Sequence, residues 1–173
     1  MKMVVTSGAT REHIDPIRFI SNVSTGTLGS LIASQALAAG FEVMYIHGVG
    51  AVLPGESDGI SMFEVVSAED LRSRLRTVLN DPEIKAVVHP MAVSDFTPSE
   101  TAPCKIPSNT AGLQLLLRPT PKIVKDIKRT RPDILLVSFK LETGLSETEL
   151  IQKGKAALRE TSSDIVVVNE LEK

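Results

Sequence analysis

Continuous runs of apolar residues alternate with amphipathic stretches along most of this chain, and no other feature limits its possible folds as strongly. Strands that are buried on both faces of a parallel sheet have unbroken apolar runs, and helices usually connect them. Helices are predicted at 26–39, at 67–80, from 120 onward and at 146–159. Strands are predicted at 3–6, 41–47, 60–66, 86–89, 113–117, 134–139 and 165–168.

This order of elements predicts an α/β, Rossmann-like fold, in which helices cover both faces of a mainly parallel sheet. Ligands of such sheets bind beyond the carboxyl ends of the strands. Two long loops begin at such ends, one after 3–6 and one, at 90–112, after 86–89. We therefore look for a site in these two loops.

Local signals support several of the predicted helices. Leu28, Leu31, Ile32 and Ala36 have the spacing of one helix face, and Gly40 is a typical C-terminal cap. They favour a helix with one apolar face.

Two further helix starts carry capping signals. Thr120 is a good capping residue and Pro121 suits a first helical turn. Ser146, followed three residues later by Glu149, has the pattern of a capping box. Helices are therefore expected to begin at these two points.

The composition excludes several classes of function. The 173 residues suit one domain, and a net charge of −2 with 3% aromatic residues gives no support for nucleic-acid binding. No apolar run approaches the ~20 residues of a membrane span, so we expect no membrane association. The one cysteine, Cys104, excludes an intrachain disulfide, and a cytoplasmic protein is the simplest interpretation.

The loop after the first strand has the layout of a nucleotide site without the dinucleotide fingerprint G-x-G-x-x-G. Gly8 permits a ligand to approach the backbone, and Ser24 and Gly26 lie at a predicted helix start, where free N–H groups favour anions. Gly29 follows one turn later. Two interpretations remain equal here: a phosphate site, or an ordinary helix cap at Ser24 or Thr25 with a packing glycine at Gly29.

Two polar residues between those ends are candidates for contacts with a substrate. Arg18 can form a bidentate pair with a phosphate or a carboxylate, although a surface ion pair with Asp15 or Glu12 is commoner. Asn22 can donate and accept hydrogen bonds together, so it could orient a carbonyl, but a turn role is favoured by residue type alone.

The loop at 90–112 is apolar where it begins and carries charged candidates further along. Met91 and Ala92 suggest a segment folded over a ligand or a partner. Asp95 could bind a polar group or a metal, or form only a turn. Lys105 lies between two prolines and could close over a phosphate, or be an ordinary solvated lysine.

The remaining titratable residues give weaker signals. The three histidines show no spacing typical of metal ligands, and His47 and His89 are expected to be buried at strand ends. Lys155 belongs to a basic face of the last helix, which is either solvated or in contact with a triphosphate.

Several strings in these loops together resemble the phosphopantothenoylcysteine synthetase family, also called phosphopantothenate–cysteine ligase. The similar segments follow the family's order over nearly the whole chain. They are SGAT at 7–10, DPIRFISNVSTG at 15–26, MAVSDF at 91–96, KI at 105–106, PTPKI at 119–123, SFKLET at 138–143 and VVVN at 166–169.

The resemblance implies a two-step ligase reaction of coenzyme A biosynthesis. The carboxylate of 4′-phosphopantothenate attacks the α-phosphate of CTP or ATP, which arrives with Mg²⁺, and pyrophosphate leaves. The amine of cysteine then displaces the nucleotide and forms an amide. Such chemistry needs positioning and charge neutralisation rather than a protein nucleophile. The family also implies a homodimer.

The resemblance further implies a role for each matching residue. Asn22, Lys105 and Arg18 would be catalytic, with Asn22 holding the acyl group and Lys105 closing over the reacting phosphate. Asn22, Met91, Ala92 and Asp95 would bind the substrate. The nucleotide would be bound by Gly8, Ser24, Gly26, Gly29, Phe139, Asn169 and Lys155.

The chain departs from the family pattern in several places, including Thr25 for a common serine and Glu170 where many members have aspartate. The family has two glycines where this chain has Gly8 and Ala9, which leaves the second close backbone approach open. Members generally continue past the position of Lys173, so 1–173 is expected to be a single nucleotide-binding ligase domain that can lack a C-terminal tail. The alternatives are an NAD(P)-dependent oxidoreductase on a similar sheet, or a nucleotide-binding module without catalysis.

Overall fold

A six-stranded sheet forms the centre of the molecule. The computed structural model describes residues 1–55, 58–109 and 112–171. In these residues each neighbouring pair of strands in the central sheet is parallel, in the order β10-β9-β6-β1-β4-β5. The strands are β1 (Lys2–Ser7), β4 (Glu42–Gly48), β5 (Ile60–Val65), β6 (Ile84–His89), β9 (Leu135–Glu142) and β10 (Ile165–Glu170).

The strand order places a topological switch point between β1 and β6. The chain runs outward from β1 through β4 to β5, then crosses back to β6 and continues through β9 to β10. This is the doubly wound Rossmann order, and its ligands bind in the crevice where the direction reverses. The predicted α/β, Rossmann-like fold is therefore confirmed, and both candidate loops leave from that crevice.

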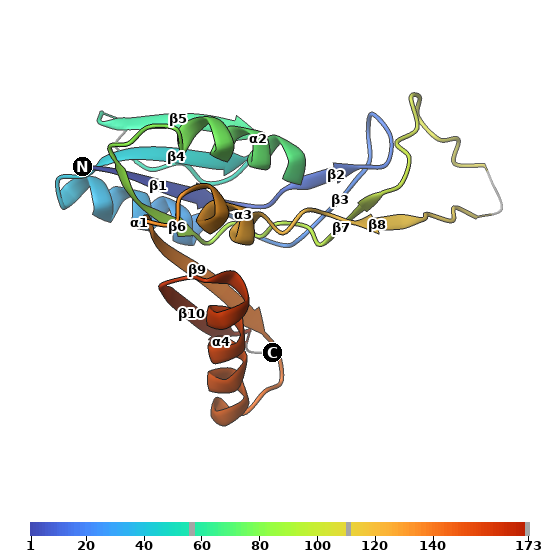
Figure 1. Cartoon of the computed structure of the whole chain (residues 1–173). Helices are drawn as coiled ribbons and strands as arrows, with labels where there is room; N and C mark the ends of the chain where they lie inside the picture. Colours follow the sequence, from blue (N-terminus) through green and yellow to red (C-terminus); the bar gives the residue numbers. More distant parts are fainter. Residues whose placement is uncertain (56–57, 110–111, 172–173) are drawn as a thin grey trace.

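Helices cover both faces of the sheet (Figure 1). α1 (Thr27–Ala38) packs on β1 and β4, and its Ala33 joins one core cluster with Val5 and Tyr45. On the other face, α2 (Ala68–Val78) and α3 (Ile123–Thr130) contribute to a second cluster. α4 (Glu147–Thr161) packs on β9 and β10 and contacts α3.

The face that α1 buries coincides only in part with its apolar face. Leu28 and Leu31 are 45% and 59% exposed, whereas Gly29, Ala33 and Ala36 are buried. Small side chains allow the helix backbone to approach β1 closely, and the leucines then point away from the sheet. The apolar spacing predicted the helix correctly, and of its four residues Ile32 and Ala36 pack in the core while Leu28 and Leu31 do not.

Capping signals predicted one helix start well and another poorly. Ser146 and Glu149 form the predicted capping box of α4. The predicted start at Thr120 is wrong, because α3 begins at Ile123 after Lys122. The Thr120 hydroxyl donates instead to the Ser94 carbonyl, so it joins two loops.

The two long loops contain strands that the sequence did not reveal. The first carries an antiparallel hairpin of β2 (Arg11–His13) and β3 (Phe19–Ser21), and the second pairs β7 (Phe96–Pro98) with β8 (Leu117–Pro119). The strand predicted at 113–117 is wrong, since 112–116 is irregular and β8 starts at Leu117. The two pairs form an arm that projects from the sheet (Figure 1).

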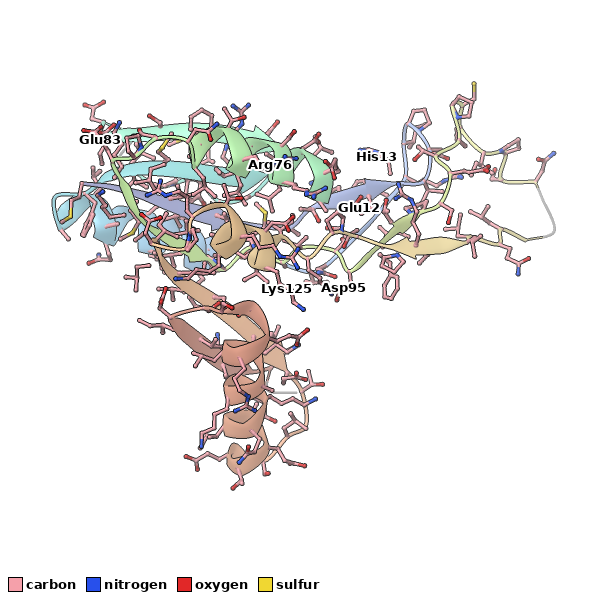
Figure 2. The ribbon with its side chains drawn as sticks, in the orientation of Figure 1. Glu12, His13, Arg76, Glu83, Asp95 and Lys125 are labelled. Carbon is pink, nitrogen blue, oxygen red and sulfur yellow. The ribbon has the colours of Figure 1, made fainter. Side chains whose placement is uncertain are left out.

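A buried carboxylate joins this arm to the sheet layer. Glu12 of β2 is 5% exposed, and its Oε1 accepts a hydrogen bond from the Ala68 amide, 2.8 Å away, at the first residue of α2. Figure 2 shows Glu12 at the base of the arm. A negative charge at a helix amino end is stabilised by the helix dipole, so the base of the arm has a fixed position.

Candidate functional site

The two loops at the switch point are bonded to one another just beyond β1 and β6. Ala9 and Ala92 form a parallel bridge, in which the Ala92 amide donates to the Gly8 carbonyl at 2.9 Å. The Thr10 amide donates to the Ala92 carbonyl at 3.2 Å, and the Ser94 amide donates to the Thr10 hydroxyl at 3.0 Å. These bonds fix both walls of the crevice relative to the sheet.

The glycines at the amino end of α1 allow the helix to lie against the end of β1. A Cβ at Gly29 would lie 2.4 Å from the Ser7 hydroxyl oxygen, and one at Gly26, whose φ is +81°, would lie 2.9 Å from it. A Cβ at Gly8 would lie 2.7 Å from that of Ala51. Gly29 is therefore a packing glycine, and a nucleotide role for these three residues stays a prediction.

The amino end of α1 remains available for an anion. Its N-cap is Gly26, which has no side chain to satisfy the free N–H groups, and Ser24 beside it is exposed. The expectation of a Ser24 or Thr25 N-cap is thus wrong, although the Thr25 hydroxyl accepts a bond from the Thr27 amide at 3.3 Å. The uncapped end favours negative charge.

The Ala9 carbonyl is in close contact with the backbone of another strand. The contact is made by Gly48 at the end of β4, where an added Cβ would lie 2.1 Å from the Ala9 carbonyl oxygen. The contact is possible because Gly48 has no side chain, and Ala9 keeps its methyl group.

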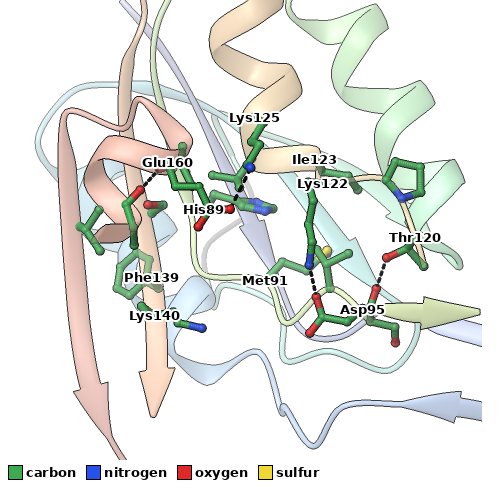
Figure 3. Close-up of a pocket in the computed structure, with 18 residues that line it drawn as sticks. His89, Met91, Asp95, Thr120, Lys122, Ile123, Lys125, Phe139, Lys140 and Glu160 are labelled. Atoms are coloured by element: carbon green, nitrogen blue, oxygen red, sulfur yellow. Dashed lines mark hydrogen bonds and ion pairs between the residues drawn. The ribbon is translucent and has the colours of Figure 1, made fainter. Parts of the chain in front are cut away.

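A pocket of about 270 Å³ opens beyond β6 and β9, between the start of α3 and the end of α4 (Figure 3). It brings together Met91, Asp95 and Phe139, which the sequence had divided between two ligands. The structure thus places two of the four predicted substrate residues, Met91 and Asp95, in one pocket with one predicted nucleotide residue, Phe139.

Three lysines that sequence reasoning missed also line this pocket, namely Lys122, Lys125 and Lys140. Each pairs with a carboxylate: Lys122 with Asp95, Lys125 with Glu160 at 2.8 Å, and Lys140 with Glu142 at 3.3 Å. The exposed pairs at Asp95 and Glu160 contribute little stability, so an anionic ligand can replace either carboxylate.

One buried polar atom of the pocket lacks a protein partner. Ser94 is 3% exposed, and its hydroxyl has no hydrogen-bond partner among the residues that the structure describes. A buried hydroxyl without a partner is unfavourable. Ser94 is therefore suited to a polar ligand in this pocket, and no sequence signal identified it.

His89 lies at the end of β6, and its ring borders the same pocket. It is buried as predicted, and its Nδ1 lies 2.7 Å from the Thr6 hydroxyl. Desolvation lowers the pKa of His89 to about 4, so the ring is neutral at pH 7.

This pKa predicts acid destabilisation of the fold. The unfolded chain binds a proton near pH 6.5 and the folded chain near pH 4, so the stabilisation is complete above 6.5 and lost between 6.5 and 4. Lowering the pH from 7.5 to 5 should reduce the unfolding free energy by about 2 kcal/mol through His89. Urea titrations at the two pH values should show this loss in the wild type and its absence in His89→Asn. An equal loss in the variant would assign it to other groups.

The candidates of the β2–β3 hairpin face the second loop. Asn22 is exposed, and its Nδ2 donates to the Val93 carbonyl at 3.2 Å. Arg18 makes the ion pair that we considered as its alternative role, with Nη1 3.2 Å from the Asp15 carboxylate. Lys105 is exposed and has no ion pair or side-chain hydrogen bond within 1–55, 58–109 and 112–171.

None of the other six predicted nucleotide residues lines the pocket of Phe139. Gly8 follows β1, and Ser24, Gly26 and Gly29 lie at the amino end of α1. Asn169 lies near the end of β10, opposite Leu141 of β9, and is exposed. Lys155 lines a different groove, between α4 and Val168 of β10. Asn169 and Lys155 therefore do not lie in one site with Phe139, and their roles in nucleotide binding stay predictions.

Two negative findings apply to the described part of the chain. It holds no group of three or more His, Cys, Asp or Glu residues placed to bind a metal ion. Within the same residues, none of the helices has both the length and the apolar character needed to cross a bilayer.

The strand order and the cationic pocket beside its switch point define an α/β protein of the doubly wound, ligand-binding class. The chain belongs to the family of the DNA/pantothenate metabolism flavoprotein C-terminal domain, whose model matches residues 1–173.

Relatives and solved structures agree with this membership. The chain is 41% identical over 170 residues to the coenzyme A biosynthesis bifunctional protein CoaBC of Thermococcus kodakarensis, covering 98% of this chain and 41% of that protein. It therefore spans less than half the length of this relative. The crystal structure of the DNA/pantothenate metabolism flavoprotein from Streptococcus pneumoniae has a TM-score of 0.90 at 32% identity, over 99% of this chain and 82% of that one. A Cab2 H337A variant in complex with phosphopantothenate-cysteine shares the fold, with a TM-score of 0.79 at 23% identity, over 98% and 72% of the two chains.

Proposed function

We propose that this chain is a phosphopantothenate–cysteine ligase of coenzyme A biosynthesis. The observation that carries the proposal is the pocket that joins Phe139, Met91 and Asp95 with three lysines beside the switch point. The similarity to the coenzyme A biosynthesis protein CoaBC and to the Cab2 complex with phosphopantothenate-cysteine supports the substrate class.

The proposed reaction has two steps. The substrate carboxylate attacks the α-phosphorus of CTP or ATP, and the bond to pyrophosphate breaks. The cysteine amine then attacks the acyl carbon, loses a proton, and releases the nucleoside monophosphate as the amide forms. Both steps build negative charge on oxygen, which lysines and helix N–H groups stabilise.

The site offers a place for each part of the substrates. In our proposal the base lies against Phe139, and the phosphates lie between the amino end of α1 at Ser24 and the pocket lysines. Met91 and Asp95 hold the pantothenate part. Lys105 closes over the reacting phosphate from the second loop.

Three further residues complete the assignment. Asn22 holds the acyl carbonyl, Arg18 attracts the anionic substrate, and Ala92 lines the crevice through its backbone. The bond between Asn22 and the Val93 carbonyl supports this placement, because it keeps the hairpin against the second loop.

Magnesium enters this proposal as part of the nucleotide co-substrate. Mg²⁺ is usually held by substrate phosphates, waters and one or two carboxylates rather than by a cage of protein ligands. Asp95 and Glu160 line the pocket and supply oxygens of the required kind. They would bind the ion through its outer waters or directly, and the ion would neutralise charge on the phosphates.

Exposed apolar residues of the arm support a homodimer. Leu116 and Phe96 are 77% and 52% exposed, and Val23 at the end of the hairpin is fully exposed. A second copy of the chain would cover them in our proposal.

A single cysteine, Cys104, that is exposed and free suits a cytoplasmic enzyme.

A pyrophosphate-release assay tests the ligase proposal. The protein is incubated with 4′-phosphopantothenate and Mg²⁺, with CTP and ATP in separate reactions, in the presence and absence of cysteine. We expect pyrophosphate with at least one nucleotide, and the amide product only when cysteine is present. If no pyrophosphate forms and a separate assay with NAD(P)H shows hydride transfer, an oxidoreductase is favoured. Nucleotide binding with no turnover would favour a binding module.

A further inference from the structure

Asp15, in the turn between β2 and β3, is a buried carboxylate with an unusual number of donors. Its side chain is 0% exposed. Oδ1 accepts hydrogen bonds from the Ile17 and Arg18 amides, both at 2.8 Å. Oδ2 accepts from the Ile106 amide at 3.1 Å and from the Arg18 guanidinium at 3.2 Å. Three of these four donors belong to its own turn, and one belongs to a distant loop.

The distant donor is the residue that follows Lys105. The segment 101–106 is also bonded to the hairpin at its other end, where the Thr101 hydroxyl donates to the His13 carbonyl at 3.1 Å and the Ala102 amide donates to the Ile14 carbonyl at 2.9 Å. Lys105 is thus exposed on a short loop that is anchored on both sides.

We propose that Asp15 is a positioning residue that anchors the Lys105 loop and orients Arg18, so that one buried carboxylate fixes the place of two cations. The anchoring part stands on the hydrogen bonds alone. The consequence for catalysis rests on the proposed function, in which Lys105 and Arg18 act on the anionic substrates.

The chemistry of the carboxylate explains why aspartate suits this position. An ionised carboxylate only accepts hydrogen bonds, and its two oxygens accept from several donors at once. Burial raises the pKa of Asp15, but hydrogen bonds from Ile17, Arg18 and Ile106 outweigh it, and the net shift is downward. The group is therefore ionised at neutral pH. An asparagine would direct an N–H toward the Ile106 or Arg18 donors and lose that contact.

The first test measures the anchor without reference to catalysis. Hydrogen exchange of the segment around Ile106 is followed by mass spectrometry in the wild type, in Asp15→Asn and in the control Glu100→Gln, which changes an exposed carboxylate next to the same segment. We expect exchange at Ile106 to accelerate about tenfold or more in Asp15→Asn, since a charge-assisted bond is lost. The control should match the wild type. Unchanged exchange in Asp15→Asn would overturn the anchor.

The second test asks whether Asp15 acts through Lys105. Pyrophosphate release is measured for Asp15→Asn, Lys105→Ala and the double variant. We expect Asp15→Asn to slow release at least tenfold in the wild-type background and by a clearly smaller factor when Lys105 is already alanine, where only the effect through Arg18 remains. The same fold loss in both backgrounds would contradict the positioning role. If the wild type releases no pyrophosphate, the ligase proposal fails while the exchange result still decides the anchor.

A second variant keeps the proposal testable should Asp15→Asn fail to fold. Ile106→Pro removes the distant N–H donor, together with the half-buried isoleucine side chain, and leaves the turn bonds of Asp15 in place. Ile106 precedes Pro107, so its backbone is already restricted to the extended region that proline tolerates. We expect faster exchange at Cys104 and Lys105 and slower pyrophosphate release at unchanged thermal stability. Wild-type values for both would contradict the anchor.

Discussion

Replacing Lys105 by alanine should slow pyrophosphate release by about 100- to 1000-fold, the usual cost of removing one group that stabilises transition-state charge. Lys105 is exposed and makes no ion pair within the described residues, so the unfolding free energy should change by less than about 0.5 kcal/mol. Pre-steady-state pyrophosphate release and urea unfolding measure the two quantities. Lys105→Gln should show the same loss, because it removes the charge and keeps most of the length.

Lys85→Ala is a matched control for this prediction. Lys85 is also exposed, but it lies at the start of β6, at the opposite end of that strand from the pocket. Its replacement should leave turnover within twofold. Near-normal turnover in Lys105→Ala would remove Lys105 from the mechanism, and a loss of similar size in Lys85→Ala would indicate a general effect of surface charge.

Asn22→Asp should separate the two half-reactions. Pyrophosphate release should stay within about threefold of the wild type, while amide formation slows by about 100-fold and the acyl-nucleotide accumulates. The reason is that the Asn22 amide donates a hydrogen bond, here to the Val93 carbonyl, whereas an ionised aspartate only accepts. The substitution therefore removes a hydrogen-bond donor to the acyl oxygen, while the size of the side chain hardly changes. Quenched-flow measurements with and without cysteine follow both steps.

Asn80→Asp introduces the same chemical change at the exposed end of α2 and should leave both steps unchanged. Equal slowing of both half-reactions in Asn22→Asp would contradict the assigned role, since a residue that acts only on the acyl group cannot alter nucleotide transfer by the same factor.

The central sheet was predictable because its strands are buried on both faces, and burial of that kind leaves an unbroken apolar run in the sequence. Val4, Val5, Ile46 and Val87 are fully buried in such runs. The hairpin strands were not predictable, because three-residue strands such as β2 and β7 bury no continuous face. Their pairing depends on contacts between loops that are distant in the sequence.

The buried face of α1 shows a second limit of sequence patterns. Apolar spacing gives the phase of a helix only when large side chains face the core. Here the close approach of Gly29 to Ser7 selects the face with small residues, and Leu28 is left exposed. The distance between the helix and the strand decides which face of the helix is buried, and the spacing of apolar residues does not predict that distance.

The candidate site was predictable where several residues stand in one string, as with Met91 and Asp95. Isolated lysines carry no such signal. Lys122 and Lys140 line the same pocket only because α3, α4 and β9 pack together. The nucleotide role of Lys155 stays a prediction, since a basic helix face does not reveal which groove it borders, and Lys155 lines the groove between α4 and β10.

The long excursion between β6 and β9 also bears on the order in which the molecule assembles. Residues 2–89 contain four adjacent strands, whereas β9, α4 and β10 form the following edge of the sheet. In a nascent chain the connection of more than 40 residues between β6 and β9 separates these strands, so the amino-terminal strands can pair before β9 and β10 are synthesised. The pocket takes His89 from the early part and Phe139 from the late part. A nascent chain that has completed only the first four strands therefore lacks this ligand pocket. Ligand binding in the pocket then indicates that the whole sheet has folded.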